Sequence, residues 1–250
     1  MPARIRLDRV SKGFVTDRGE LQVLDDVSLE VGDGEIVAIV GPSGCGKSTL
    51  MSVMAGFTRA DRGTVLVDGA PLAGPSPRGI LMSQQGAMFP WLTVRQNLMF
   101  GLVGRASAER IELADHYASL VGLRGFEDSY PHELSGGMLK RAELARALVV
   151  KPEILYMDEP FSALDALLSL RMRKELLRIL GEERHTVVLI THDVEEAIHL
   201  ADRILVLSPR PTRIQASFEV AIAHPRRIAG ADVQALRAAV LLELGMDESI

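Results

Sequence analysis

Apolar residues fall into short runs along the chain, and most of these runs predict β-strands. Three of them, EIVAIVG (35–41), ILYMD (154–158) and TVVLITH (186–192), are almost continuously apolar, as strands buried in a parallel sheet are. Each is followed by a polar or glycine-rich segment and then by a helical pattern. This alternation predicts an α/β protein with a parallel sheet at its centre.

Other segments predict a second sheet and a helical insertion. Residues 5–14, 24–35 and 63–69 alternate apolar with polar positions, which is typical of half-exposed strands in an antiparallel element. Residues from about 92 to 150 have helical spacing and few β-branched runs. We therefore expect a helical lobe inserted between strands of the core.

Composition excludes several classes of protein. The 250 residues are 47% hydrophobic, with 28 Lys and Arg against 33 Asp and Glu for a net charge of −5. This balance offers no basic surface for nucleic acid, and no apolar run approaches the roughly 20 residues of a membrane span. The first residues are charged and do not resemble a secretory signal. We expect a single intracellular domain over residues 1–250, with a short C-terminal extension over 211–250.

The segment GPSGCGKST (41–49) has the pattern of a phosphate-binding loop between a strand and a helix. Its glycines let backbone N–H groups turn inward around phosphate oxygens, and the helix that follows adds its positive dipole end. Lys47 supplies a cation for the β- and γ-phosphates, and Ser48 offers a hydroxyl to Mg²⁺. The residues predicted to bind nucleotide here are Gly41, Pro42, Ser43, Gly44, Cys45, Gly46, Lys47, Ser48 and Thr49.

The single cysteine, Cys45, excludes a disulfide framework and a Cys-rich zinc site. Two interpretations of its thiol remain open. Lys47 and the helix N-terminus would favour a reactive thiolate, whereas an inert small residue would simply fit the loop.

Polar residues end two of the predicted buried strands. Asp158 and Glu159 follow ILYM at the sheet edge where ligands bind in open α/β folds. There Asp158 is suited to Mg²⁺, and Glu159 to polarising an attacking water; the alternative is a helix N-cap or a solvated turn. His192 ends TVVLIT in the same way, where a neutral imidazole would contact a γ-phosphate, although a lone histidine is more often structural.

LSGGMLKR (134–141) begins another predicted helix. Ser135, Gly136 and Gly137 would present a hydroxyl and backbone N–H groups at its N-terminus, which makes a second anion site. The alternative is a plain helix start with Ser135 as N-cap. On the anion-site interpretation, the chain would have two anion-binding loops, residues 41–49 and LSGGM, but only one nucleotide-binding motif. This suggests that LSGGM contacts the nucleotide bound by another subunit.

The order of these motifs resembles the ATPase subunits of ATP-binding cassette (ABC) transporters. The resemblance covers about residues 4–216 and rests on GPSGCGKST, SQQGAMFPW (83–91), LSGGM, ILYMDEP, SALD (162–165) and THD (191–193). It implies a P-loop (RecA-like) parallel-sheet core with an antiparallel β subdomain and an inserted helical lobe. The implied cofactors are ATP and Mg²⁺.

The resemblance also implies roles for residues outside the phosphate loop. Phe14, in VSKGF, would stack on adenine, with a core position in a strand as the alternative. Gln84 matches a loop glutamine that touches Mg²⁺ and senses the membrane partner, and its spacing to Trp91 favours it over Gln85. Asp165 matches the loop that communicates across a dimer.

The resemblance implies two copies closing head to tail, with each nucleotide between the phosphate loop of one copy and LSGGM of the other. The expected catalytic residues are Glu159, His192 and Lys47, and the expected Mg²⁺ ligands are Ser48, Gln84 and Asp158. The implied partners are a separate membrane permease and, indirectly, a periplasmic or extracellular solute-binding protein. The implied location is peripheral, at the cytoplasmic face of the inner (plasma) membrane.

Two departures and several alternatives accompany this interpretation. Met138 stands where many members have Gln, and Leu139–Lys140 where Arg–Gln is common, but the serine and both glycines remain and we expect activity.

DNA-repair and chromosome-maintenance relatives carry coiled coils or zinc modules between the motifs, which this sequence lacks. A non-catalytic binding module would be expected to have another residue in place of Glu159 or His192, and both residues are present here. A permease-associated ATPase is favoured, with an ABC ATPase outside transport as the alternative.

Two further segments resemble the ATPases of nitrate, sulfonate and taurine importers, AMFPWLTVRQNLMFGL (87–102) and ADRILVLSPRPTRI (201–214). Met138 also fits this group, and the chain leaves no room for the C-terminal regulatory domain of sugar importers. The resemblance implies uptake of a small anion, with an amino acid, a metal, a pyrimidine precursor or a lipid as alternatives. Phe89, Pro90 and Trp91 would line an apolar groove for a permease helix, unless Trp91 is a buried anchor of the lobe.

Overall fold

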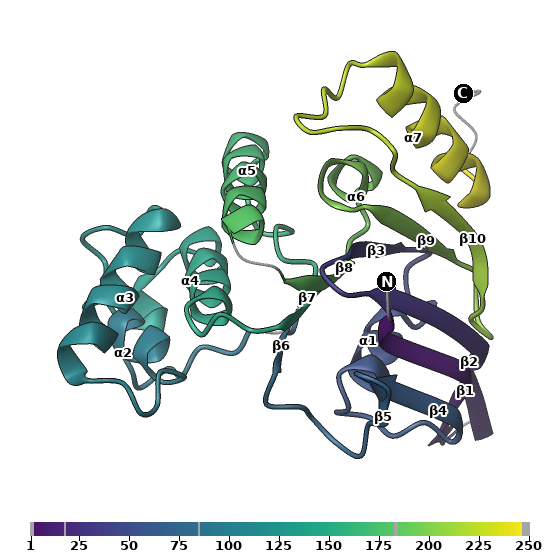
Figure 1. Ribbon diagram of the computed structural model, residues 1–250, viewed down its shortest axis with the longest axis horizontal. Coiled ribbons are helices and arrows are strands. Elements are labelled where there is room, and N and C mark those ends of the chain that lie inside the picture. The colour runs from purple at the N-terminus through teal and green to yellow at the C-terminus, as the bar shows by residue number, and fades with distance from the viewer. Residues whose placement is uncertain (1–2, 18, 85, 183–184, 247–250) are drawn as a thin grey trace. The chain divides into compact units, whose positions relative to one another are not determined.

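A computed structural model describes residues 3–17, 19–84, 86–182 and 185–246 of the chain. The chain divides into two compact units, which are visible in Figure 1. Unit 1 comprises Met1–Gly79 with His185–Ile250, and unit 2 comprises Ile80–Arg184. No helix in the described ranges combines the length and the apolar character that crossing a membrane requires.

The antiparallel sheet of unit 1 confirms the alternating patterns in the N-terminal part of the chain. Its strands, in the spatial order β2-β1-β4-β5, are β1 (Ala3–Thr16), β2 (Gly19–Gly32), β4 (Arg62–Val67) and β5 (Ala70–Pro71). In β1 the apolar residues Ile5 and Leu7 are buried while Arg6 between them is exposed. This alternation leaves one face of the sheet for the core and the other for water.

The second sheet of unit 1 contains two of the predicted buried strands. Its order is β10-β9-β3-β8, with β3 (Ile36–Val40), β8 (Thr186–Ile190), β9 (Arg203–Leu207) and β10 (Ile214–Glu219). Strand β3 pairs in parallel with both β8 and β9, and β10 pairs antiparallel with β9. Neither β9 nor β10 is predicted by the hydrophobic pattern. The segment 211–250, expected to be a C-terminal extension, contributes the edge strand β10 to this sheet.

The described part of unit 1 also contains helices, which Figure 1 labels. They are α1 (Lys47–Met54), α6 (Val194–Leu200) and α7 (Ala231–Glu243). Helix α1 contacts β2 of one sheet and β8 of the other, so it links the two sheets directly after the predicted phosphate loop. Helix α6 packs on β3, and α7 packs on α6 and β10. The buried Arg226 guanidinium fastens the segment before α7 by donating to the carbonyl oxygens of Ile198 and Ala201 at 2.7 and 2.6 Å.

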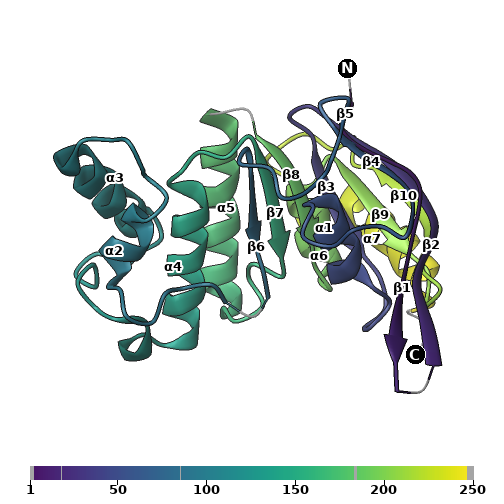
Figure 2. The same ribbon diagram turned by 90° about the horizontal axis from the view of Figure 1, so that it is seen from below.

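Unit 2 contains the predicted helical lobe, drawn in blue-green in Figure 2. Its elements are β6 (Gly79–Met82), which begins at the last residue of unit 1, α2 (Val94–Met99), α3 (Ser107–Leu120), a 3₁₀ turn (Pro131–Glu133), α4 (Gly136–Leu148), β7 (Ile154–Asp158) and α5 (Ala166–Glu182). Helix α2 packs against α3 and α4. All five residues of β7 are buried, as expected from its apolar run.

A buried amide holds the turn that precedes α2. Asn97 is fully buried, and its Nδ2 donates to the carbonyl oxygens of Phe89, Leu92 and Thr93 at 3.0–3.1 Å. Its Oδ1 accepts from the N–H of Phe89 at 2.8 Å. One side chain therefore satisfies four backbone groups of a loop that has no regular secondary structure of its own.

We expect Asn97→Ala to destabilise unit 2 by about 2–3 kcal/mol, because the N–H of Phe89 and the carbonyl oxygen of Leu92 lose their hydrogen-bond partner. Urea unfolding followed by fluorescence measures this directly, since the only tryptophan of the chain, Trp91, lies in the same turn. Val103→Ala is the control, because that side chain is 85% exposed. Equal midpoints for the two variants would show that the Asn97 contacts do not stabilise the fold.

Candidate functional site

The phosphate loop has a backbone that only glycine allows. Gly44 and Gly46 have φ of +72° and +118°, and a Cβ on Gly46 would lie 2.6 Å from Cγ1 of Val23. No side chain caps the N-terminus of α1 at Gly46, so its first N–H groups remain available to an anion. Lys47 Nζ donates to the carbonyl oxygens of Gly41 and Pro42 at 2.8 and 3.0 Å. The Lys47 side chain therefore folds back along the loop and bonds to the backbone at its start.

Cys45 fits the inert interpretation better than the reactive one. Its side chain is 2% exposed, and burial raises the pKa of the thiol even though Lys47 acts in the opposite direction. A buried, protonated thiol is a poor nucleophile. Cys45 therefore fills space beneath the loop.

Thr212 is a contact of the phosphate loop that the motifs did not indicate. Its hydroxyl donates to the carbonyl oxygen of Cys45, and its backbone N–H donates to Val23 O at 2.8 Å. Its own carbonyl accepts from Asp25 N at 3.0 Å. The sequence shows only a threonine in a proline-rich segment, and neither its burial nor its partner can be identified without the fold.

Phe14 lies on β1 and lines a cavity of about 510 Å³ in unit 1. Its side chain is 42% exposed, so it is not a core residue of the strand. Lys12 Nζ lies 5.2 Å from the ring centroid and bonds to Asp61 at 2.7 Å. The N–H of Gly13 holds the pKa of Asp61 below its usual range. An exposed aromatic face beside a cavity is suited to stacking.

The acidic pair after β7 lies at the expected strand end. Asp158 is buried, and Glu159 has a φ of +51°, which is unusual for a residue with a side chain. Ser162 Oγ donates to the Glu159 carbonyl at 3.1 Å. The next helix, α5, begins only at Ala166, so this pair is not a helix N-cap.

Gln84 and Glu159 are brought together within unit 2. The Nε2 of Gln84 donates to Oε2 of Glu159 at 3.4 Å. Gln85, the alternative to Gln84, lies outside the described residues. The contact leaves the amide oxygen of Gln84 available to a cation.

The LSGGM segment begins α4 as expected. Ser135 is the N-cap and its Oγ accepts from Met138 N at 3.3 Å, which matches the plain-cap alternative. The two interpretations are compatible, because a hydroxyl that accepts still has a hydrogen to donate. Gly136 is exposed, with open space where a Cβ would be. Asp165 Oδ1 accepts from Leu168 N at 2.9 Å at the start of α5.

His192 lies two residues after β8 and is exposed. The neighbouring Asp193 caps α6 by accepting from the N–H groups of Glu195 and Glu196 at 2.9 and 3.2 Å. The position of His192 is therefore set by the end of a buried strand on one side and a capped helix on the other.

Side chains of α4 hold the segment that carries Gln84. Lys140 and Glu143 are buried as an ion pair at 3.4 Å. Lys140 Nζ reaches the Ser83 carbonyl at 3.5 Å, and Glu143 Oε1 accepts from Ala87 N at 3.2 Å. The departure at Lys140 thus has a structural role that the sequence pattern does not reveal.

Phe89, Trp91 and Phe100 form a partly exposed group that we call the aromatic patch. Ring centroids of Phe89 lie 5.5 Å from Trp91 and 4.6 Å from Phe100, and the Arg146 guanidinium lies 4.4 Å above the Phe89 ring. Trp91 is 70% exposed. The alternative that it is a buried anchor of the lobe is therefore wrong.

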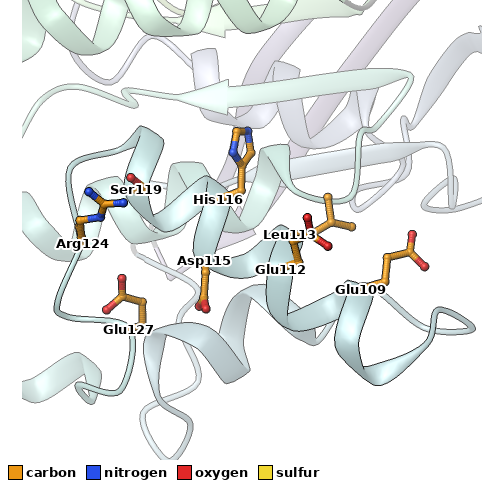
Figure 3. A pocket seen from close by; sticks show the side chains of 8 residues that line it. All are labelled: Glu109, Glu112, Leu113, Asp115, His116, Ser119, Arg124 and Glu127. Atoms are coloured by element: carbon orange, nitrogen blue, oxygen red, sulfur yellow. The ribbon is translucent and has the colours of Figure 1, made fainter.

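A second cavity, of about 690 Å³, lies in the helical lobe (Figure 3). It is lined by Glu109, Glu112, Leu113, Asp115, His116, Ser119, Arg124 and Glu127. Glu109, Glu112 and Asp115 lie along α3 and Glu127 lies on the segment after it (Figure 3), and no metal-binding cluster of His, Cys, Asp and Glu occurs among the described residues. It includes none of the predicted site residues.

Relatives that match most of the chain include ATP-binding proteins of importers. A putative ATP-binding protein of Brucella abortus is 50% identical over 210 residues, 83% of this chain and 81% of that protein. The aliphatic sulfonates import ATP-binding protein of Bacillus thuringiensis is 37% identical over 237 residues, 95% and 94% of the two chains. The taurine import ATP-binding protein of Roseobacter denitrificans is 39% identical over 222 residues, 88% and 83% of the two chains.

Solved structures confirm the P-loop α/β fold class. A dimeric bacterial ABC transporter cassette has a TM-score of 0.80 at 27% identity, covering 88% of this chain and 100% of the other. The same cassette in a post-hydrolysis state with ADP and phosphate gives a TM-score of 0.79. The family model of ABC transporters matches residues 24–162. The chain therefore belongs to the ABC transporter family, as an ATP-binding and ATP-hydrolysing member.

Proposed function

We propose that this chain is the ATPase subunit of an importer of small anions of the sulfonate, taurine or nitrate type. The observation that carries the proposal is the match to aliphatic sulfonates and taurine import ATP-binding proteins over 95% and 88% of the chain. These matches extend well beyond the phosphate loop, and take in both segments whose sequence is typical of that group. ATP hydrolysis by this subunit drives a separate permease between its states.

In this proposal the phosphate loop binds the phosphates of ATP, and residues near the strand ends help to bind Mg²⁺. Residues 41–49 bind the phosphates and Phe14 stacks on adenine. Ser48, Gln84 and Asp158 offer a hydroxyl, an amide oxygen and a carboxylate, the oxygen donors that Mg²⁺ prefers. The buried Asp158 carboxylate and the available Gln84 oxygen fit this ion, which neutralises phosphate charge when bound.

Glu159 polarises the attacking water in this proposal, and His192 orients it towards the γ-phosphate. Lys47 holds the charge that develops on the phosphate oxygens. The backbone of Glu159 has a positive φ, and its carbonyl oxygen accepts from Ser162 Oγ. Gln84 touches the carboxylate of Glu159, so movement of the Gln84 segment changes the catalytic base.

Two copies of the chain form the working ATPase. Ser135 and Gly136 are exposed at the start of α4 and offer a hydroxyl and N–H groups to the nucleotide of a second copy. Asp165 is exposed as well and lies at the start of α5. The dimeric state of the related cassette supports this arrangement.

The aromatic patch receives the permease. An exposed tryptophan next to two phenylalanines and an arginine has the composition of a binding hot spot, and the segment that carries it also carries Gln84. Docking there places the subunit peripherally at the cytoplasmic face of the plasma membrane.

A solute-binding protein outside the membrane delivers the anion to the permease. Over residues 1–250 the chain acts as one ATPase domain, with 92–150 as its helical lobe and 211–250 as its extension.

Growth and uptake assays test the proposed cargo. Deletion of the gene should abolish uptake of at least one labelled anion among an alkanesulfonate, taurine and nitrate, and reintroduction of the wild-type gene should restore it. A Lys47→Ala copy should not restore it, because that variant loses the phosphate-binding cation. Unchanged uptake of all three anions in the deletion strain would overturn the anion assignment.

Glu159→Gln should reduce the rate of ATP hydrolysis by about 100-fold or more, because it removes the charge that polarises water while keeping size and hydrogen bonding. ATP affinity should be retained, and the nucleotide-bound dimer should persist in size-exclusion chromatography. Glu112→Gln is the matched control, an exposed carboxylate of the same unit outside the proposed site. A Glu159→Gln enzyme with the wild-type rate would exclude Glu159 as the base.

Trp91→Ala should abolish co-purification with the permease and leave the basal ATPase rate of the isolated subunit unchanged. The reason is that its 70% exposed ring contributes contact area without supporting the fold. Phe57→Ala, at a side chain 59% exposed in unit 1, is the control and should co-purify normally. Normal complex formation by Trp91→Ala would contradict a docking role for the aromatic patch.

A further inference from the structure

Arg210 lies beside the phosphate loop although no nucleotide-binding motif includes it. A Cβ built on Gly44 would lie 3.7 Å from Nη2 of Arg210. Both residues belong to unit 1, and Gly44 is one of the two glycines of the loop with a positive φ. The guanidinium is therefore in the immediate surroundings of the predicted phosphate site.

The segment 208–213, which we call the arginine strap, is fastened to the loop at its C-terminal side. The buried Thr212 donates its hydroxyl to the carbonyl oxygen of Cys45, and Thr212 forms a parallel bridge with Leu24 of β2. At the base of the strap, Ser208 N donates to Arg213 O at 3.0 Å, and Arg213 N donates to Ser208 Oγ at 3.0 Å. These bonds hold the backbone of Arg210 in a short closed turn beside the loop, within reach of its side chain.

The two arginines of the strap differ in their charge environment. Arg213 pairs with Asp25 at 2.5 Å, and this carboxylate raises the pKa of the guanidinium. Arg210 is exposed and has no hydrogen bond or ion pair among the described residues. Its positive charge is thus not neutralised by the protein, whereas that of Arg213 is.

The field of Arg210 reaches the interior of the loop. Both Lys47 and Arg210 lower the pKa of the buried Cys45 thiol, although burial outweighs them. A charge that stabilises a thiolate at this position also stabilises an anion held by the same loop. Arg210 influences the Cys45 thiol because the strap places the guanidinium close to the loop.

We propose that Arg210 is a further nucleotide-binding residue, which adds a second positive charge to the phosphate loop beside Lys47 and strengthens binding of the polyphosphate of ATP. The proposal rests on the ATPase function, since ATP is the ligand. Arg210 acts through its charge, and the strap serves to hold that charge in place. Because Arg210 is exposed, its contribution falls as salt screens it, over a distance of about 8–10 Å at physiological ionic strength.

Binding of a non-hydrolysable, Mg²⁺-loaded ATP analogue to the full chain tests the proposal by calorimetry at low and high salt. Arg210→Gln should weaken binding about three- to five-fold at low salt, the range of an exposed charge pair. The difference from wild type should shrink at high salt. Arg210→Lys should restore most of the affinity, because it keeps the charge.

Arg213→Gln is the matched control on the same strap, and its affinity should stay within about two-fold of wild type because Asp25 already neutralises that arginine. Melting temperatures of all variants identify any loss of folding. Wild-type affinity and salt dependence in Arg210→Gln, or equal weakening in Arg210→Lys and Arg210→Gln, would overturn the proposal. Failure of the wild-type chain to bind the analogue would instead overturn the nucleotide assignment.

Discussion

The close approach at Gly46 is the constraint on which the arrangement of unit 1 depends. Its backbone lies at a φ of +118°, and a Cβ there would be 2.6 Å from Val23 and 3.3 Å from Thr212 Oγ1. Three segments distant in sequence, the phosphate loop, β2 and the arginine strap, therefore meet where only a hydrogen atom fits. Any larger residue would push the loop off the strap and misalign the N–H groups that bind phosphate.

Unit 2 depends in a similar way on buried polar side chains of α2 and α4. Asn97 satisfies four backbone groups around Phe89, and Lys140 with Glu143 holds the chain on either side of Gln84. A buried polar group fixes geometry because each lost partner costs free energy. The loop with Gln84 and the aromatic patch therefore has a defined shape without being a helix or a strand.

Much of the fold could be predicted because its signals are local. The runs at β3, β7 and β8 are apolar throughout, and the phosphate loop has a fixed spacing of glycines. Strand β10 could not be predicted in this way, since its burial alternates between intermediate and exposed and only its pairing with β9 defines it. The role of Lys140 and the partner of Thr212 were also missed, because both contacts join residues far apart in sequence. Such contacts have no periodic signature that a single sequence reveals.

Helix α4 connects the two kinds of chemistry in unit 2. Its N-terminus presents Ser135 to the nucleotide of a second copy, as proposed, and one face of the same helix holds the Gln84 segment through Lys140 and Glu143. A helix transmits displacement along its axis because its backbone hydrogen bonds are continuous. Within unit 2 the printed contacts therefore run from α4 through Lys140 and Glu143 to Ser83 and Ala87, and from the neighbouring Gln84 to Glu159. One helix thus carries both the residue proposed to meet a second copy and the side chains that hold the segment next to the proposed catalytic base.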